Sequence, residues 1–154
     1  MLEQQLLVLR PRPAPTPQTI VEAAGGARLG FTRWRPAGRL TRLFLGPVLE
    51  VREQDDEPLL FTVRRCWRFA ARHLVCDADD QPVGEFDRAQ LLDRLGRLFS
   101  VRRREGERVV FRTLSGCPVA EAETVEEGLR LSFHAAVENE PFAKMLLLAA
   151  VLNP

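Results

Sequence analysis

The stretch that decides the fold is Val75-Cys-Asp-Ala-Asp-Asp-Gln-Pro-Val-Gly-Glu85, in which two apolar positions flank a short acidic turn. Asp side chains hydrogen-bond their own backbone and tolerate left-handed conformations, so Asp79-Asp80 is typical of a tight turn. The same template returns along the chain, at spacings of 22 to 30 residues. The copies occupy residues 21–31, 51–61, 101–111 and, without the leading valine, 127–133. Each copy predicts a β-hairpin.

Alternating apolar residues on either side of the turns support this interpretation. In the last copy, Leu129, Leu131 and Phe133 alternate with polar residues, as in a half-buried strand. Five hairpins give ten strands, and residues 3–10 offer an eleventh. A chain of 154 residues is one domain by the usual range of roughly 100–200 residues. The sequence therefore predicts one all-β domain, a sandwich or a barrel.

One internal segment departs from the strand pattern. Asp87 is a plausible helix N-cap, and Leu91, Leu92, Leu95 and Leu98 follow at helical spacing. We expect a short surface helix over residues 87–98, although Gly96 disfavours it.

The C-terminal segment predicts a second helix. Asn139 can cap it, Pro141 is tolerated in its first turn, and residues 142–152 are apolar on every side except at Lys144. A helix that is apolar all round must be buried, and its eleven residues span about 16 Å, near the height of a small barrel. We expect a sheet wrapped around this helix, with membrane insertion of the tail as the rival. Lys144 is expected to reach the rim or to mark a polar site.

These features together resemble a known family. Hairpins of the form V-x-D-x-D-x-x-x-V-G, seen at Val75–Gly84, precede an apolar helix introduced by an acidic, proline-containing turn. Over residues 18–154 this order resembles the tubby-like superfamily, in its phospholipid scramblase and LURP-one-related branch. The resemblance implies that residues 1–154 form a single mainly β domain. It would be a closed antiparallel barrel of about twelve strands around a central apolar helix at about 140–152.

The family's functions transfer only in part. Scramblase-type proteins are associated with phospholipids and calcium, and tubby domains with phosphoinositides, whereas LURP-one-related proteins act in defence by an undefined mechanism. This chain lacks the palmitoylated cysteine cluster of scramblases, and residues 132–138 lack the Asp-rich run proposed to bind calcium. The terminal helix is also too short to cross a bilayer. The resemblance therefore implies a binding module, without implying that this chain flips lipids.

The composition restricts which kinds of partner and which cellular compartment are expected. The charges nearly cancel, at 22 basic against 21 acidic side chains. Together with the absence of tyrosine, this disfavours nucleic-acid binding through Arg64–Arg65 or Arg102–Arg104. The three cysteines are an odd number, the N-terminus does not resemble a signal peptide, and no segment is a transmembrane candidate. We therefore expect a cytoplasmic location.

No catalytic, cofactor or metal motif is recognisable. Cys66, His73 and Cys76, with Asp77 as a fourth candidate, do not have a known zinc spacing. Ser115 does not lie in a G-x-S-x-G nucleophile elbow, and residues 77–85 fail the calcium-loop pattern. We expect no enzyme activity, no cofactor and no bound metal.

Two functional hypotheses remain. The first is a phospholipid-headgroup or membrane-surface site, formed by Arg33, Trp34, Arg35, Arg39 and Arg42, because arginines beside a tryptophan suit phosphates at an interface. These residues could also form a solvated connector.

The second is a protein-interaction or scaffold module, including self-association. Residues 102–112 are rich in arginine, whereas residues 118–140 are rich in glutamate. These opposite charges could pair between two copies or lie side by side in one barrel.

Overall fold

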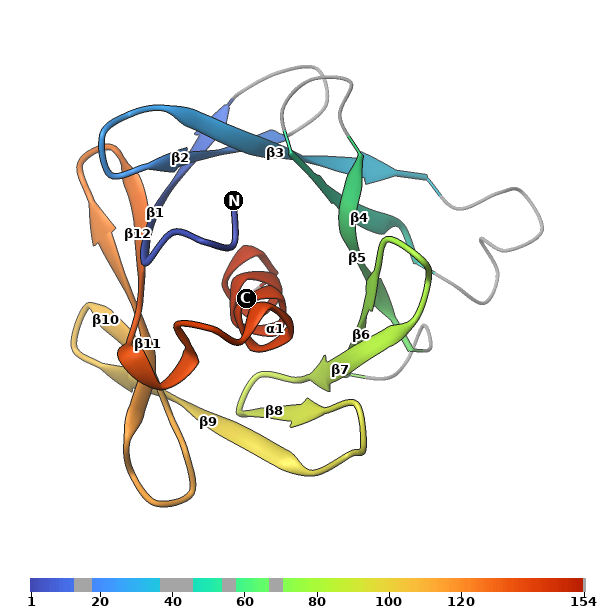
Figure 1. Ribbon diagram of the computed structural model, residues 1–154, viewed down its shortest axis with the longest axis vertical. Helices are drawn as coiled ribbons and strands as arrows, with labels where there is room; N and C mark the ends of the chain where they lie inside the picture. Colours follow the sequence, from blue (N-terminus) through green and yellow to red (C-terminus); the bar gives the residue numbers. More distant parts are fainter. Residues whose placement is uncertain (13–17, 37–45, 54–57, 67–70, 154) are drawn as a thin grey trace.

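The computed structural model describes residues 1–12, 18–36, 46–53, 58–66 and 71–153 (Figure 1). Within these ranges it contains twelve β-strands, a 3-10 helix, η2 (Ala135–Val137), and an α-helix, α1 (Pro141–Leu152). The strands are β1 (Leu6–Arg12), β2 (Gln18–Ala23), β3 (Arg28–Arg35), β4 (Val48–Arg52), β5 (Leu59–Arg65), β6 (His73–Asp77), β7 (Pro82–Phe86), β8 (Gln90–Asp93), β9 (Leu98–Glu105), β10 (Arg108–Arg112), β11 (Pro118–Val125) and β12 (Gly128–Phe133).

The strands form one closed antiparallel barrel. Each strand pairs with its neighbours in sequence, and β12 returns to pair with β1 through Leu7 opposite Leu131 and Leu9 opposite Leu129. Among the described strands, closure leaves no edge free for pairing with another chain. The expected mainly β barrel of about twelve strands is confirmed.

The five repeated segments are the hairpins β2–β3, β4–β5, β6–β7, β9–β10 and β11–β12, as predicted. In the defining copy, Oδ1 of Asp77 accepts hydrogen bonds from the backbone N–H groups of Asp79 (3.0 Å) and Gln81 (2.8 Å). Asp80 takes the left-handed conformation, with φ of 59°. The acidic turn therefore satisfies its own backbone donors, which is why this sequence recurs at strand reversals.

The predicted surface helix over residues 87–98 is wrong. The segment instead forms β8 between β7 and β9, followed by a turn with Gly96 at φ of 73°. Oδ1 of Asp87 accepts from the N–H groups of Ala89 and Gln90, so Asp87 caps a turn and not a helix. Leu91 is fully buried, whereas Leu95 is 65% exposed in the next turn. The helical spacing of leucines arose from a short strand joined to a turn.

The C-terminal helix is confirmed, and Figure 1 shows α1 inside the barrel. All residues from Lys144 to Val151 are buried, so packing within the barrel accounts for the apolar surface of the helix. Pro141 is its first residue, as predicted. The expected cap is wrong: the chain enters through η2, the N-cap position falls on Glu140, and no side chain caps the helix. Nowhere in the described ranges is a helix sufficiently long and apolar for a membrane span.

The barrel has two distinct ends. The entry end, where α1 begins, carries the N-terminal segment 1–5 and the turns after β6 and β8; the exit end, where α1 finishes, carries the turns after β7 and β9. Near the entry end α1 passes close to β7 at Gly84. A Cβ atom there would collide with the carbonyl oxygen of Leu92 and press against Leu146. The missing side chain therefore lets the helix and β8 approach this strand.

Lys144 is fully buried near the entry end, so the expectation that it reaches the solvent at the rim is wrong. Its Nζ donates to the backbone carbonyls of Leu2 (2.8 Å) and Gln4 (3.4 Å), and it lies 5.4 Å from the centre of the Phe133 ring. The N-terminal segment lies inside the rim in Figure 1 and supplies these acceptors. The alternative expectation, a polar site around Lys144, describes the structure.

Candidate functional site

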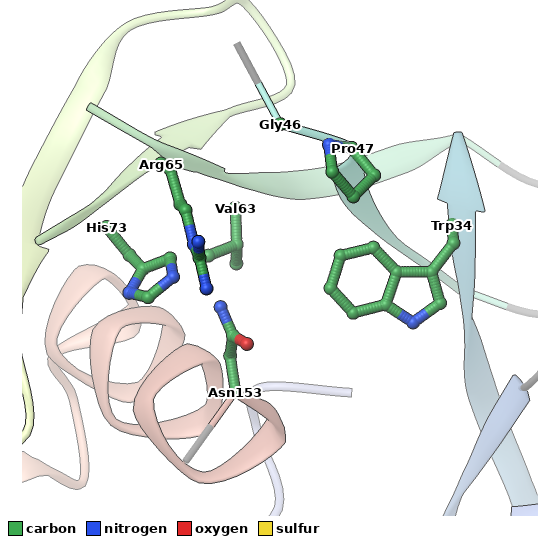
Figure 2. A pocket seen from close by; sticks show the side chains of 7 residues that line it. All are labelled: Trp34, Gly46, Pro47, Val63, Arg65, His73 and Asn153. Carbon is green, nitrogen blue, oxygen red and sulfur yellow. The ribbon is translucent and has the colours of Figure 1, made fainter. Parts of the chain in front are cut away.

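A cleft opens at the exit end between β3, β5, β6 and the end of α1 (Figure 2). Its volume is about 230 Å³. The lining residues are Trp34, Gly46, Pro47, Val63, Arg65, His73 and Asn153. The indole of Trp34 lies on one side, beneath Pro47, and the guanidinium of Arg65 lies on the other, between His73 and Asn153.

Strand register explains why these side chains meet. Trp34 is paired with Leu49, Leu49 with Val63, and Arg65 with His73. Paired residues point to the same side of a sheet, and residues two apart share a face. Leu49 and Val63 are buried core residues, so Trp34, Arg65 and His73 extend the inner face of the barrel to its rim.

His73 is a neutral member of the cleft. Its ring stacks on Phe86, with centroids 5.0 Å apart and an angle of 21° between the planes. Burial, together with the positive charge of Arg65, lowers the pKa of His73 below its ordinary value. The ring is therefore uncharged at neutral pH and can offer one donor and one acceptor nitrogen.

Among the described residues that line the cleft, Arg65 is the one with a cationic side chain. Arg65 is exposed, and no carboxylate of the described ranges pairs with it. The carboxyl end of α1 opposes this charge with about half a negative elementary charge, part of it satisfied by the Asn153 N–H donating to the Ala149 carbonyl at 3.1 Å. The full guanidinium charge exceeds that partial charge, so these two groups together favour an anion beside Arg65.

The predicted headgroup residues are only partly brought together. Trp34 lines the cleft, whereas Arg33 and Arg35 are exposed on the outer face of β3, because alternate residues of a strand point to opposite faces. Arg35 forms an ion pair with the buried Glu50, with Nη1 and Oε1 3.2 Å apart. Arg39 and Arg42 lie outside the described residues.

Three polar side chains of the cleft were absent from the sequence-based site. Arg65 and His73 were missed because they belong to different repeats, and Asn153 because the helix position was known only in outline. The strand order could have identified this pair. In a hairpin the last residue of the first strand lies opposite the first residue of the second, so Arg65 at the end of β5 and His73 at the start of β6 share one face.

The cysteines do not combine with His73 as a metal site. His73 is on the inner face of β6, whereas Cys76 is on its outer face, where Nη2 of Arg64 contacts the sulfur at 3.5 Å. Burial raises the pKa of the Cys76 thiol and of the Cys66 thiol, so both are protonated at neutral pH. Within the ranges described above, no group of three histidine, cysteine or acidic side chains is arranged to hold a metal ion.

The two arginine runs, at residues 64–65 and 102–104, are divided between the two faces of the sheet because side chains alternate along a strand. Arg64 and Arg103 point outward, whereas Arg65, Arg102 and Arg104 point inward, so neither arginine run forms one continuous basic surface.

The basic and acidic segments of the second hypothesis lie side by side in one barrel. Glu123 of β11 pairs with Arg108 of β10 at 3.2 Å and with Arg130 of β12 at 3.1 Å.

Comparison with known proteins adds no relative: no family model, no curated protein and no solved structure matches this chain.

Proposed function

We propose that the chain is a non-enzymatic binding module that recognises an anionic phospholipid headgroup at the exit end of its barrel. The observation that carries this proposal is the cleft in which the Trp34 indole faces the Arg65 guanidinium, which has no carboxylate partner among the described residues. A guanidinium matches the oxygens of a phosphate through forked hydrogen bonds. An indole suits the boundary between headgroups and acyl chains, because it combines an apolar body with one polar N–H.

Neighbouring charges favour a membrane surface over an isolated small anion. Arg33 is exposed beside Trp34 on the same strand, and Arg35, although exposed, is paired with Glu50. Each basic residue close to an anionic leaflet contributes about 1 kcal/mol of attraction. All three cysteines are free thiols, which suits a reducing compartment, so we place the membrane face on the cytoplasmic leaflet.

The proposal of a family rests on the turn pattern and on the architecture of the barrel. The turn pattern at Val75–Gly84 and the acidic, proline-containing approach to the terminal helix resemble the tubby-like superfamily. A twelve-stranded barrel with its helix inside is the architecture which that resemblance implies. We therefore propose a tubby-like module of the scramblase and LURP-one-related type.

Vesicle sedimentation tests the proposal. The wild-type chain is expected to sediment with phosphatidylcholine vesicles that contain phosphatidylserine and to stay in solution with phosphatidylcholine alone. R33E/R65E is expected to lose this binding, because two attractions become repulsions. R39E/R42E measures how much Arg39 and Arg42, the other two arginines of the predicted headgroup site, contribute to vesicle binding.

The matched control is R97E/R94E, which makes the same double charge change on two exposed side chains at the entry end. It is expected to retain at least half of the wild-type binding. Absence of wild-type binding to anionic vesicles, or equal losses for R33E/R65E and R97E/R94E, would contradict the proposal. The latter result would mean that only total charge matters.

One observation favours a second candidate, self-association. At the entry end a groove of about 470 Å³ lies between the start of α1 and the turns after β6 and β8. Leu95 and Phe142 line it and are 65% and 50% exposed. Light scattering at rising protein concentration tests this candidate: the wild type should associate and L95S/F142S should remain monomeric. A wild-type chain that stays monomeric contradicts it.

A further inference from the structure

A second pocket at the exit end lies on the wall formed by β9 to β12, across the barrel from the cleft. Its volume is about 260 Å³. Three arginines, Arg88, Arg102 and Arg104, line it together with Glu107, and its apolar surface includes Val109 and Leu129. This volume is just below the range of about 300–1,000 Å³ that is usual for small-molecule sites, so it suits a compact group.

Register places two of these arginines on the inner face of the barrel. Arg102 is paired with Phe111, which is fully buried in the core, and Arg104 is paired with Val109. Side chains of a directly opposed pair share a face. Two guanidinium groups therefore continue a surface that is apolar deeper in the barrel.

The third arginine is held beside them by the turn between β7 and β8. Oδ1 of Asp87 accepts the N–H groups of Ala89 and Gln90 at 2.8 and 2.9 Å. The backbone N–H of Arg102 then donates to the Ala89 carbonyl at 2.8 Å. This contact fixes the turn, and with it Arg88, against β9.

The arginines on the two faces of this wall differ in their partners. On the outer face, Arg108 and Arg130 both pair with Glu123, and Arg112 pairs with Glu105. On the inner face, the guanidinium of Arg102 has no hydrogen-bond or ion-pair partner in the described part of the chain, and that of Arg104 has only the Gly106 carbonyl, 3.3 Å from its Nε. Glu107 pairs with neither of them.

Arginine side chains that are partly buried and lack partners lower the stability of the ligand-free protein. Burial lowers the pKa of Arg102, which reports the loss of hydration around its charge. A charge that loses water without gaining a partner is destabilising. An anion in the pocket would supply the missing acceptors for all three guanidinium groups.

We propose that Arg88, Arg102 and Arg104 form a binding site for a phosphate group, carried either by a soluble phosphate compound or by a phosphorylated lipid headgroup. The site is separate from the cleft of the proposed function. Glu107 at the margin disfavours a bulky polyanion and limits the occupant to a compact phosphomonoester or diphosphate.

Calorimetry with the full chain tests the site, using inorganic pyrophosphate as the soluble probe. Phosphatidylcholine vesicles containing phosphatidylinositol phosphate are the lipid probe, with phosphatidylcholine vesicles as their blank. The variant is R102Q/R104Q, and the matched control is R103Q, because Arg103 is on the same strand with its side chain outward. R88Q, on an exposed turn, is a second variant in case the double variant fails to fold.

We expect saturable binding of at least one probe. R102Q/R104Q or R88Q should weaken it by about tenfold or more, because charge-assisted hydrogen bonds to the phosphate are lost, whereas R103Q should leave it within about twofold. Pyrophosphate binding identifies a soluble ligand, and binding to the lipid vesicles alone identifies a headgroup.

No saturable binding of either probe, or an equal loss with R103Q, would overturn the site. R33E/R65E separates this proposal from the first, because it should abolish sedimentation with phosphatidylserine vesicles and leave pyrophosphate binding unchanged.

Discussion

His73 links the candidate cleft to pH. Its folded-state pKa lies below the ordinary value of 6.5 because of burial and Arg65. As pH falls, the unfolded chain therefore binds a proton at His73 before the folded chain does. The contribution of His73 to stability is complete above about pH 6.5 and is lost as pH falls through the folded-state pKa. We predict that urea unfolding of the wild type weakens between pH 7.5 and 5.5, and that H73Q shows a smaller decline.

The same histidine reports on ligand. An anion bound beside Arg65 would favour the imidazolium form, so His73 titrated by NMR should show a higher pKa with anionic headgroups present. An unchanged pH dependence in H73Q would mean that the decline arises elsewhere in the chain.

Lys144 holds the N-terminal segment through two backbone carbonyls. K144M removes these donors, and it also removes a buried charge, so the global free energy of unfolding should change by less than about 2 kcal/mol. The local effect should be larger. The Phe133 N–H, which donates to the Gln5 carbonyl at 2.8 Å, is expected to exchange with solvent about tenfold faster or more.

Hydrogen exchange measured by NMR checks this prediction. The matched control is L148M, one helical turn further along α1, which removes no hydrogen bond. Equal protection of the Phe133 amide in K144M and L148M would show that Lys144 does not hold the segment.

At the scale of elements, the packing of α1 against the barrel depends on Gly84. We predict that G84A destabilises the protein by about 1–3 kcal/mol, because the new methyl group meets the backbone of β8 and the side chain of Leu146. G25A is the control, since a Cβ atom there has nothing within 4 Å. Chemical denaturation of both variants gives the comparison, and similar stabilities would contradict the close-packing argument.

Hairpins and helix were predictable from the sequence, because their signals are local. The turn residues near Asp79 and the all-round apolar character of residues 142–152 each act within a few residues. The strand β8 was not predictable in the same way, since four residues between two turns carry too little alternation to outweigh helical spacing. Its identity depends on β7 and β9, which it joins by pairing.

The candidate site was predictable only in part for a related reason. Trp34 was found because it lies in a local cluster of basic residues, but alternation along β3 turns Arg33 and Arg35 away from the cleft. Arg65 comes from a distant part of the chain, and Asn153 meets it only because α1 runs through the barrel. Local sequence patterns do not show which residues from distant parts of the chain meet in the folded barrel.

At the scale of the whole molecule, the barrel and α1 share one core. The buried cluster joins strand residues such as Leu7, Phe61 and Phe111 to the helix residues Leu147 and Leu148. We predict that deleting residues 141–154 abolishes cooperative unfolding, because the inner wall of the barrel loses the surface that fills it. Circular dichroism on heating and binding of a hydrophobic dye check this outcome. A truncated chain with a sharp transition and no dye binding would show that the sheet folds alone.

The pairing of β1 with β12 also constrains how the chain is made. β1 is synthesised before the other strands of the barrel, but its second partner becomes available only when β12 has left the ribosome, and α1 follows later still. Until then an incomplete sheet exposes a free strand edge and an apolar face, both of which promote aggregation. The barrel therefore cannot close before β12 has been synthesised, and its interior is not filled before α1 has followed. A product shortened by a premature stop codon would be an aggregation hazard, whatever part of the ligand sites it retained.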